Sequence, residues 1–106
     1  MELKHINESE FDDLVTNNKK IVLVDFFATW CMPCKMLTSV LEQTYDKTSE
    51  ETDMFKVDID ENINLARKFG VMSVPTMIII KDGKEVDRLV GFRQSNQIIE
   101  ALNKVK

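Results

Sequence analysis

The chain has 106 residues, 43% of them hydrophobic, and a formal net charge of −4 at pH 7. That length suits a single domain, residues 1–106, with a core large enough to fold without cross-links. The acidic balance disfavours nucleic acids and anionic membranes as partners, and no apolar run is long enough to span a bilayer. Since the first residues lack the apolar core of a signal peptide, we expect a cytoplasmic protein.

The first half of the chain is expected to alternate between strands and helices. A strand around Leu3–Ile6 leads into a helix that Asn7 caps and Glu10 closes with a capping box. Residues 21–27 are almost all apolar, as is typical of a central strand buried on both faces. A long helix is expected from Cys31 onward, because apolar residues then recur at helical spacing: Met36, Leu37, Val40, Leu41 and Tyr45.

The second half is expected to end in a hairpin and a helix. A strand over Met54–Ile59 precedes a short helix that ends at Gly70. Asp82-Gly83 then separates two strand-like runs, Thr76–Ile80 and Glu85–Val90, which is a strong hairpin signal. The order β-α-β-α-β-α-β-β-α predicts an α/β fold. We expect a five-stranded mixed sheet, mostly parallel with a C-terminal antiparallel hairpin, flanked by four helices.

Cys31 and Cys34 are the only cysteines, and two residues separate them. A bridge between them closes too short a loop to add much stability, so the pair indicates chemistry rather than bracing. Cys31 is expected at the start of the long helix, where unpaired N–H groups and the helix dipole favour its thiolate. Cys31 is therefore the candidate nucleophile, and Cys34, one turn deeper on the same side, is the candidate second thiol. Pro33 suits the first turn and stiffens it.

Other chemistries of the cysteine pair are disfavoured. A zinc site needs four ligands, and the remaining candidates are His5 and scattered carboxylates, so we expect no metal. A cysteine hydrolase needs a histidine partner, and the only histidine lies far away in the first strand. The chain also lacks a glycine-rich dinucleotide fingerprint, and we expect it to bind no cofactor.

Asp25 is the only charged residue in the apolar run 21–27. A carboxylate inside a central strand is costly unless it is paired or protonated. Asp25 could instead lie at a strand edge facing water, but we favour the buried position.

The aromatic and thioether side chains near the cysteines are candidates for substrate contact. Trp30 could be a core residue, but beside the nucleophile we expect it to form one wall of a substrate groove. Met32 and Met72 are expected near that groove, where flexible thioethers suit varied protein surfaces. Met36 and Met77 are expected in the core.

These residues resemble the thioredoxin family from Leu3 to Lys104. The matching segments are Val24–Cys31, Pro33–Lys35, Lys56–Asn62, Val74–Thr76, Lys81–Gly83 and Gly91. The sequence departs from the family at three positions. Met32 stands where most members have Gly, Ser39 where many have a helix-kinking Pro, and Ser73 where Gly is frequent. We expect Met32 to influence the redox potential.

The resemblance implies a thioredoxin fold and roles for several further residues. Asp25 would lie beneath Cys34 and carry its proton, and Lys56 would modulate that carboxyl. Pro75 would have a cis bond that turns the Val74 backbone toward substrate. The implied catalytic residues are Cys31, Cys34, Asp25 and Lys56, and the implied substrate-binding residues are Trp30, Met32, Pro33, Met72, Val74, Pro75 and Gly91. Phe92 and Arg93 receive no role.

The resemblance further implies a protein-disulfide reductase that serves cytosolic redox homeostasis, and we expect a monomer because the catalytic edge is exposed. Its partners would be disulfide-containing proteins and a flavoprotein, thioredoxin reductase, which passes electrons from NADPH to the Cys31–Cys34 disulfide. Two alternatives stay open. Met32 could raise the potential enough for a thiol oxidant or isomerase, or the chain could be a non-catalytic thioredoxin-like scaffold subunit.

Overall fold

The computed structural model describes residues 2–106, and its elements follow the predicted order along the chain. They are β1 (Lys4–His5), α1 (Glu8–Phe11), the π-helical segment η1 (Asp12–Thr16), β2 (Ile21–Phe27), α2 (Met32–Thr48), β3 (Thr52–Asp58), α3 (Ile63–Lys68), β4 (Thr76–Lys81), β5 (Lys84–Val90) and α4 (Ser95–Lys104). The predicted capping box at Asn7 and Glu10 is present at the start of α1. Within residues 2–106, no helix is long and apolar enough to cross a membrane.

The five strands form one sheet in the order β1-β3-β2-β4-β5. β4 pairs antiparallel with both β2 and β5, whereas β3 pairs parallel with β1 and β2. Four strands therefore run in one direction and only β4 opposes them, which confirms the mixed, mostly parallel sheet with its C-terminal hairpin. The unit β3-α3-β4 differs from a parallel crossover, because the chain returns beside β2 in the opposite direction.

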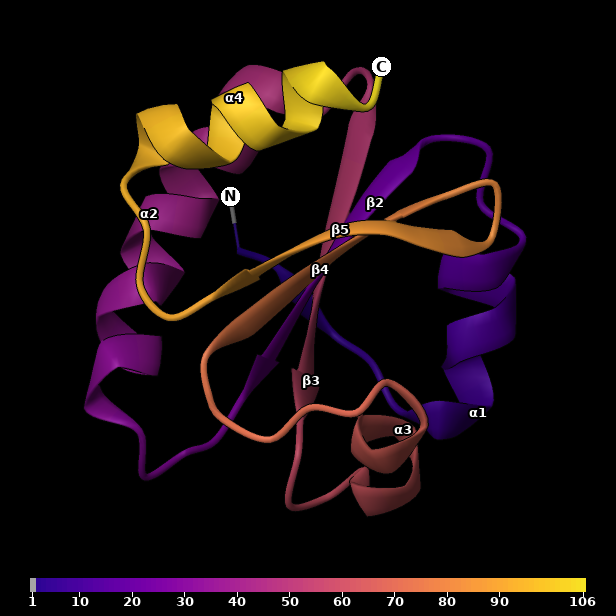
Figure 1. Cartoon of the computed structure of the whole chain (residues 1–106), viewed down its shortest axis with the longest axis vertical. Helices are drawn as coiled ribbons and strands as arrows, with labels where there is room; N and C mark the ends of the chain where they lie inside the picture. The colour runs from indigo at the N-terminus through magenta and orange to yellow at the C-terminus, as the bar shows by residue number, and fades with distance from the viewer. Residues whose placement is uncertain (1) are drawn as a thin grey trace.

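Two layers of helices cover the sheet, with α2 and α4 on one face and α1, η1 and α3 on the other (Figure 1). β2 serves both cores, and all seven of its residues are buried, as predicted for a central strand. Its odd-numbered residues Ile21 and Leu23 pack with α2 and α4, while Val22 and Val24 pack with α1 and α3. Since successive side chains of a strand alternate between faces, Asp25 and Phe27 point toward α2.

The residues of α2 that face the core are spaced one turn apart. They are Cys34, Leu37, Leu41 and Thr44. Met36 is 60% exposed, so the expectation that it lies in the core is wrong. It directly precedes Leu37, and one residue rotates a helix by roughly 100°. Met77 is fully buried, as expected.

The hairpin between β4 and β5 turns on Asp82 and Gly83, which have φ angles of 52° and 78°. Two central residues with positive φ are the signature of the tight turn that fits the twist of a hairpin. A Cβ atom at Gly83 would lie 3.0 Å from the Thr16 carbonyl oxygen. Gly83 therefore also lets the end of η1 approach the turn.

Candidate active site

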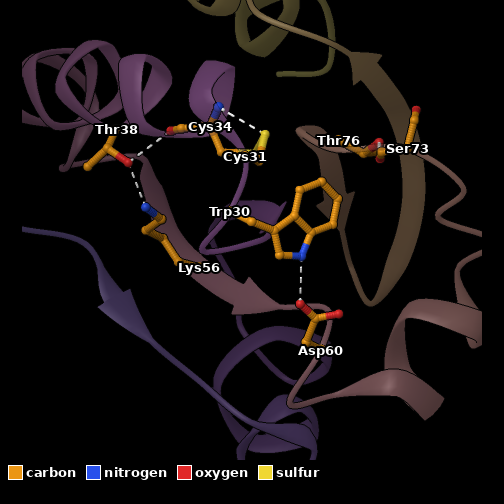
Figure 2. Close-up of a disulfide and its surroundings, with 8 residues drawn as sticks. All are labelled: Trp30, Cys31, Cys34, Thr38, Lys56, Asp60, Ser73 and Thr76. Carbon is orange, nitrogen blue, oxygen red and sulfur yellow. Dashed lines mark hydrogen bonds between the residues drawn. A yellow bond between two sulfur atoms is a disulfide. The ribbon is translucent and has the colours of Figure 1, made fainter.

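The two cysteines lie where β2 passes into α2, beyond the carboxyl end of this central strand. Cys31 is the N-cap residue of α2, and its Sγ accepts a hydrogen bond from the Cys34 backbone N–H at 3.2 Å (Figure 2). The sulfur thus replaces the side-chain oxygen that usually satisfies a free N–H at a helix start. Cys31 and Cys34 form a disulfide, with Pro33 in the first turn between them. The predicted position of Cys31 at the helix start is confirmed.

The disulfide is embedded in a small apolar cluster. Cys34 is 1% exposed and Cys31 is 5% exposed, so Cys34 is the more deeply buried, as expected. Phe27 and Ala28 belong to the same cluster, and the partly buried Val74 packs against it. Apolar neighbours restrict the approach of water and favour access through Cys31.

Asp25 lies beneath the first turns of α2. On the same face of β2 it stands between Leu23, which packs with Leu37, and Phe27, which packs with Cys34. Asp25 is fully buried, and among residues 2–106 neither carboxyl oxygen has a hydrogen-bond partner. Burial raises the pKa of Asp25 from 3.8 to about 7, against a smaller opposite effect of the Lys56 charge. The buried position is therefore confirmed, and the edge position is wrong.

Lys56 is the neighbour of Asp25 on β3, since the two residues are paired in register. It is 7% exposed, and its ammonium lies 4.4 Å from the centre of the Phe27 ring. Its Nζ donates a hydrogen bond of 2.6 Å to Thr38 Oγ1, which in turn donates to the Cys34 carbonyl oxygen at 3.1 Å (Figure 2). Thr38 and Phe27 are not among the site residues predicted from the sequence. Thr38 could have been found as the residue one turn after Cys34, and Phe27 as the next residue on the face of Asp25.

Exposed apolar side chains lie next to the cysteines in the sequence and just before the Val74-Pro75 segment. Trp30 is 69% exposed, and its indole N–H donates to Asp60 Oδ2 at 2.9 Å, which fixes the ring beside the cysteines (Figure 2). Met32 is 67% exposed and Met72 is 97% exposed. Trp30 is thus a surface residue, as expected, rather than a core aromatic.

The segment before β4 has the predicted backbone geometry. The Val74-Pro75 bond is cis, and Thr76 Oγ1 donates to the Ser73 carbonyl oxygen at 2.7 Å. Gly91, with a φ of 91°, donates its N–H to the Pro75 carbonyl oxygen at 2.8 Å. The end of β5 is therefore tied to the proline segment that lies near the cysteines.

Comparison with known proteins is consistent with this arrangement over nearly the whole chain. The family model described as Thioredoxin matches residues 2–104. The chain belongs to the thioredoxin family. Thioredoxin of Staphylococcus haemolyticus is 44% identical over 104 residues, and that of Staphylococcus epidermidis is 43% identical. Each match covers 98% of this chain and 98% of the relative.

A solved structure of chloroplastic thioredoxin z has the same fold, with a TM-score of 0.89 and 29% sequence identity. The match covers 99% of this chain and 95% of that one. The thioredoxin fold and the membership predicted from the motifs are confirmed. The protein is a thiol–disulfide oxidoreductase, and its function as a protein-disulfide reductase is supported by relatives along its full length.

Phe92 and Arg93, the two residues without a predicted role, hold the turn between β5 and α4. Arg93 donates from Nη1 to the carbonyl oxygens of Val90 and Phe92, at 2.7 and 3.1 Å. Phe92 is partly buried against the core shared by α2 and α4. Among the described residues, no group of three or more His, Cys, Asp and Glu side chains is placed to hold a metal ion.

Proposed function

We propose that this chain reduces disulfides of cytoplasmic proteins by two successive exchange reactions at Cys31 and Cys34, and so supports redox homeostasis. The observation that carries the proposal is the Cys31–Cys34 disulfide at the start of α2, above the buried carboxyl of Asp25, which has no hydrogen bond among residues 2–106. The pair can store two electrons, and the carboxyl can hold one proton.

In the first exchange, the Cys31 thiolate attacks one sulfur of the substrate disulfide. A bond forms between Cys31 and that sulfur, the substrate S–S bond breaks, and the released substrate thiolate takes a proton from water. In the second exchange, Cys34 loses its proton and attacks Cys31 Sγ. The mixed disulfide breaks, the second substrate thiolate leaves and is protonated, and the chain ends with the Cys31–Cys34 bridge. Two electrons pass from the chain to the substrate.

Asp25 is the proposed acceptor of the Cys34 proton. Its position under the first turns of α2 and its pKa of about 7 support this role, because such a carboxyl exchanges a proton readily near neutral pH. Lys56 is the proposed modulator, since its charge lowers the pKa of Asp25.

The proposed substrate surface surrounds Cys31. It comprises Trp30, Met32, Pro33, Met72, Val74, Pro75 and Gly91. Exposed apolar side chains would cover a substrate segment, and the Val74 backbone would pair with it as an added strand.

The proposed electron source is a flavoprotein, thioredoxin reductase, which would draw on NADPH and reduce the bridge. We further propose that the chain works as a monomer and as one domain over residues 1–106, with no bound cofactor. A cytoplasmic site of action is supported by the chemistry, because a reducing compartment keeps such a dithiol ready for attack.

The decisive test combines a measurement of the reduction potential of the Cys31–Cys34 couple with a trapping experiment. Titration of the Cys31–Cys34 couple against glutathione or dithiothreitol should give roughly −270 mV, whereas roughly −180 to −120 mV would indicate an oxidant or isomerase. Reduced Cys34→Ser protein should accumulate a mixed disulfide with insulin, because the second exchange is blocked. Cys31→Ser protein is the matched control and should trap nothing. A chain that neither forms the bridge nor traps insulin would be a scaffold.

A further inference from the structure

The hydroxyl of Thr38 links two groups of the active site that differ in charge. It accepts a hydrogen bond from the Lys56 ammonium at 2.6 Å and donates to the Cys34 carbonyl oxygen at 3.1 Å. A hydroxyl offers one donor and two acceptor positions, so it can satisfy both partners at once. Figure 2 shows the resulting line from Cys34 through Thr38 to Lys56.

The Lys56 ammonium belongs to a residue that is only 7% exposed. A buried ammonium loses hydration, and a lysine side chain loses much rotational freedom when it is fixed. The Phe27 ring compensates in part, since the ammonium lies 4.4 Å from its centre, but a ring face attracts a cation without a directed hydrogen bond. Thr38 supplies the directed bond.

A route to water lies beside the ammonium. A cleft of about 220 Å³ is lined by Phe27, Ala28, Thr29, Cys34, Lys35, Thr38 and Lys56. Lys56 therefore has a polar alternative within reach of its flexible stem. Thr38 and Lys56 both line this cleft, and the hydrogen bond between them limits movement of the ammonium along it.

The position of the Lys56 ammonium matters because of Asp25. Asp25 is faced by Lys56 from β3, by the uncharged Met77 from β4, and by the turns of α2 that carry Cys34. Both Asp25 oxygens lack a hydrogen bond among residues 2–106, so Lys56 acts on the carboxyl through its charge alone.

We propose that Thr38 is a positioning residue for disulfide reduction: its hydroxyl tethers the ammonium of Lys56, the register neighbour of Asp25, and keeps that charge from moving outward along the cleft toward water. This inference rests on the proposed role of Asp25 as the proton acceptor for Cys34. With the tether, the nearby positive charge keeps Asp25 able to release and take up its proton near neutral pH. Without it, Lys56 moves outward and Asp25 holds its proton to higher pH.

The test compares Thr38→Val, which removes the hydroxyl at similar volume, with Thr38→Ser, which keeps it. The carboxyl of Asp25 is titrated by 13C NMR in the reduced full-length protein, and insulin reduction is followed over the same pH range. We expect the midpoint of both curves to move upward by roughly half a pH unit or more in Thr38→Val and to stay in place in Thr38→Ser. Thr38→Ala serves in the same comparison if Thr38→Val does not fold.

Two controls separate the tether from a general effect on α2. Thr48 donates to the carbonyl oxygen one turn earlier, as Thr38 does, so Thr48→Val removes the same type of bond on the same helix. It should leave the midpoint unchanged. In a Lys56→Met background, Thr38→Val should cause no further shift. His5 contacts the edge of the Phe27 ring, but it is present in every variant and cancels in the comparison.

The outcomes distinguish the tether from the function it serves. Equal midpoints in wild type and Thr38→Val, or a shift that persists without Lys56, would overturn the tether even if insulin is reduced normally. If the wild type fails to reduce insulin, the proposed function falls, while the NMR titration still reports on the tether.

Discussion

At the scale of single residues, Asp25 combines full burial with a carboxyl that has no hydrogen bond among the described residues. Its pKa is 3.8 in its ordinary state and about 7 in the fold. A carboxyl that holds its proton more tightly in the folded than in the unfolded protein destabilises the fold as pH rises between these values. Below about pH 4 the carboxyl is protonated in both states, and the penalty is absent.

We therefore predict that Asp25→Ala is more stable than the wild type at pH 8, by a few kcal/mol and at most roughly 4 kcal/mol. The gain should shrink as pH falls from about 7 and vanish near pH 4, where a small cavity is the remaining difference. Urea unfolding of the oxidised proteins at pH 4, 6 and 8 measures the trend. A gain that is independent of pH would contradict the proton linkage.

The sequence predicts the residues of this site whose chemistry is unusual for their surroundings. Two cysteines at close spacing and one carboxylate in an apolar strand stand out without a structure. Thr38 does not, because a threonine in a helix is common and its hydrogen bond to Lys56 depends on how α2 lies over β3. Contacts between elements remote in sequence require the packing to be known.

At the scale of elements, two glycines with positive φ end or connect neighbouring segments. Gly70 has a φ of 64° just beyond α3, and a Cβ there would meet nothing within 4 Å. Gly83 has a φ of 78° in the hairpin, and its Cβ would lie 3.0 Å from the Thr16 carbonyl oxygen. The two positions share the backbone requirement and differ in the space available.

We predict that Gly70→Ala lowers the free energy of unfolding by about 1–2 kcal/mol, the usual penalty of a left-handed conformation for alanine. Gly83→Ala should lower it further, because η1 must also shift away from the new methyl group. Thermal or urea unfolding of the two variants gives the comparison. Equal losses would show that the approach of Thr16 adds nothing.

Element boundaries were predictable where a chemical signal marks them, as at Asn7, at Asp82-Gly83 and at Gly70. The orientation of α2 was not. Several of its apolar residues fit a helical stripe, and only the packed structure shows that Leu37 faces inward while Met36 faces solvent. Hydrophobicity alone does not choose between adjacent positions of a helix.

At the scale of the whole molecule, the disulfide and the exposed apolar side chains lie at one end of the sheet, and the hairpin turn lies at the other. Trp30, Met32 and Met72 are at the first end, while Val86 on β5 is an exposed apolar residue nearer the turn. This separation allows protein docking to be tested apart from chemistry.

We predict that Met72→Lys raises KM for insulin several-fold and leaves the reaction with a small aromatic disulfide unchanged. On the proposed substrate surface, a protein substrate would contact Trp30, Met32 and Met72, whereas a small disulfide would need only Cys31. Val86→Lys adds the same charge at an exposed apolar position and should change neither reaction. A similar effect of both variants would assign the change to net charge rather than to docking.

The overall architecture was predictable because alternating elements and the Asp-Gly turn leave few ways to form the sheet. The direction of β4 relative to β2 was not contained in those patterns. A strand, a short helix and a second strand suggest a parallel crossover, yet the chain here returns antiparallel.

The unequal burial of the two cysteines has a kinetic consequence. Cys34 is 1% and Cys31 is 5% exposed, so under the proposed exchange reactions electrons would enter and leave the molecule through Cys31 Sγ. The reductase that donates electrons and the disulfide substrate that accepts them would both react at that atom, so they could not be bound to it at the same time. Each would have to dissociate before the other binds. Steady-state rates should therefore follow a ping-pong law, and an excess of either partner should inhibit the other by occupying the shared entrance.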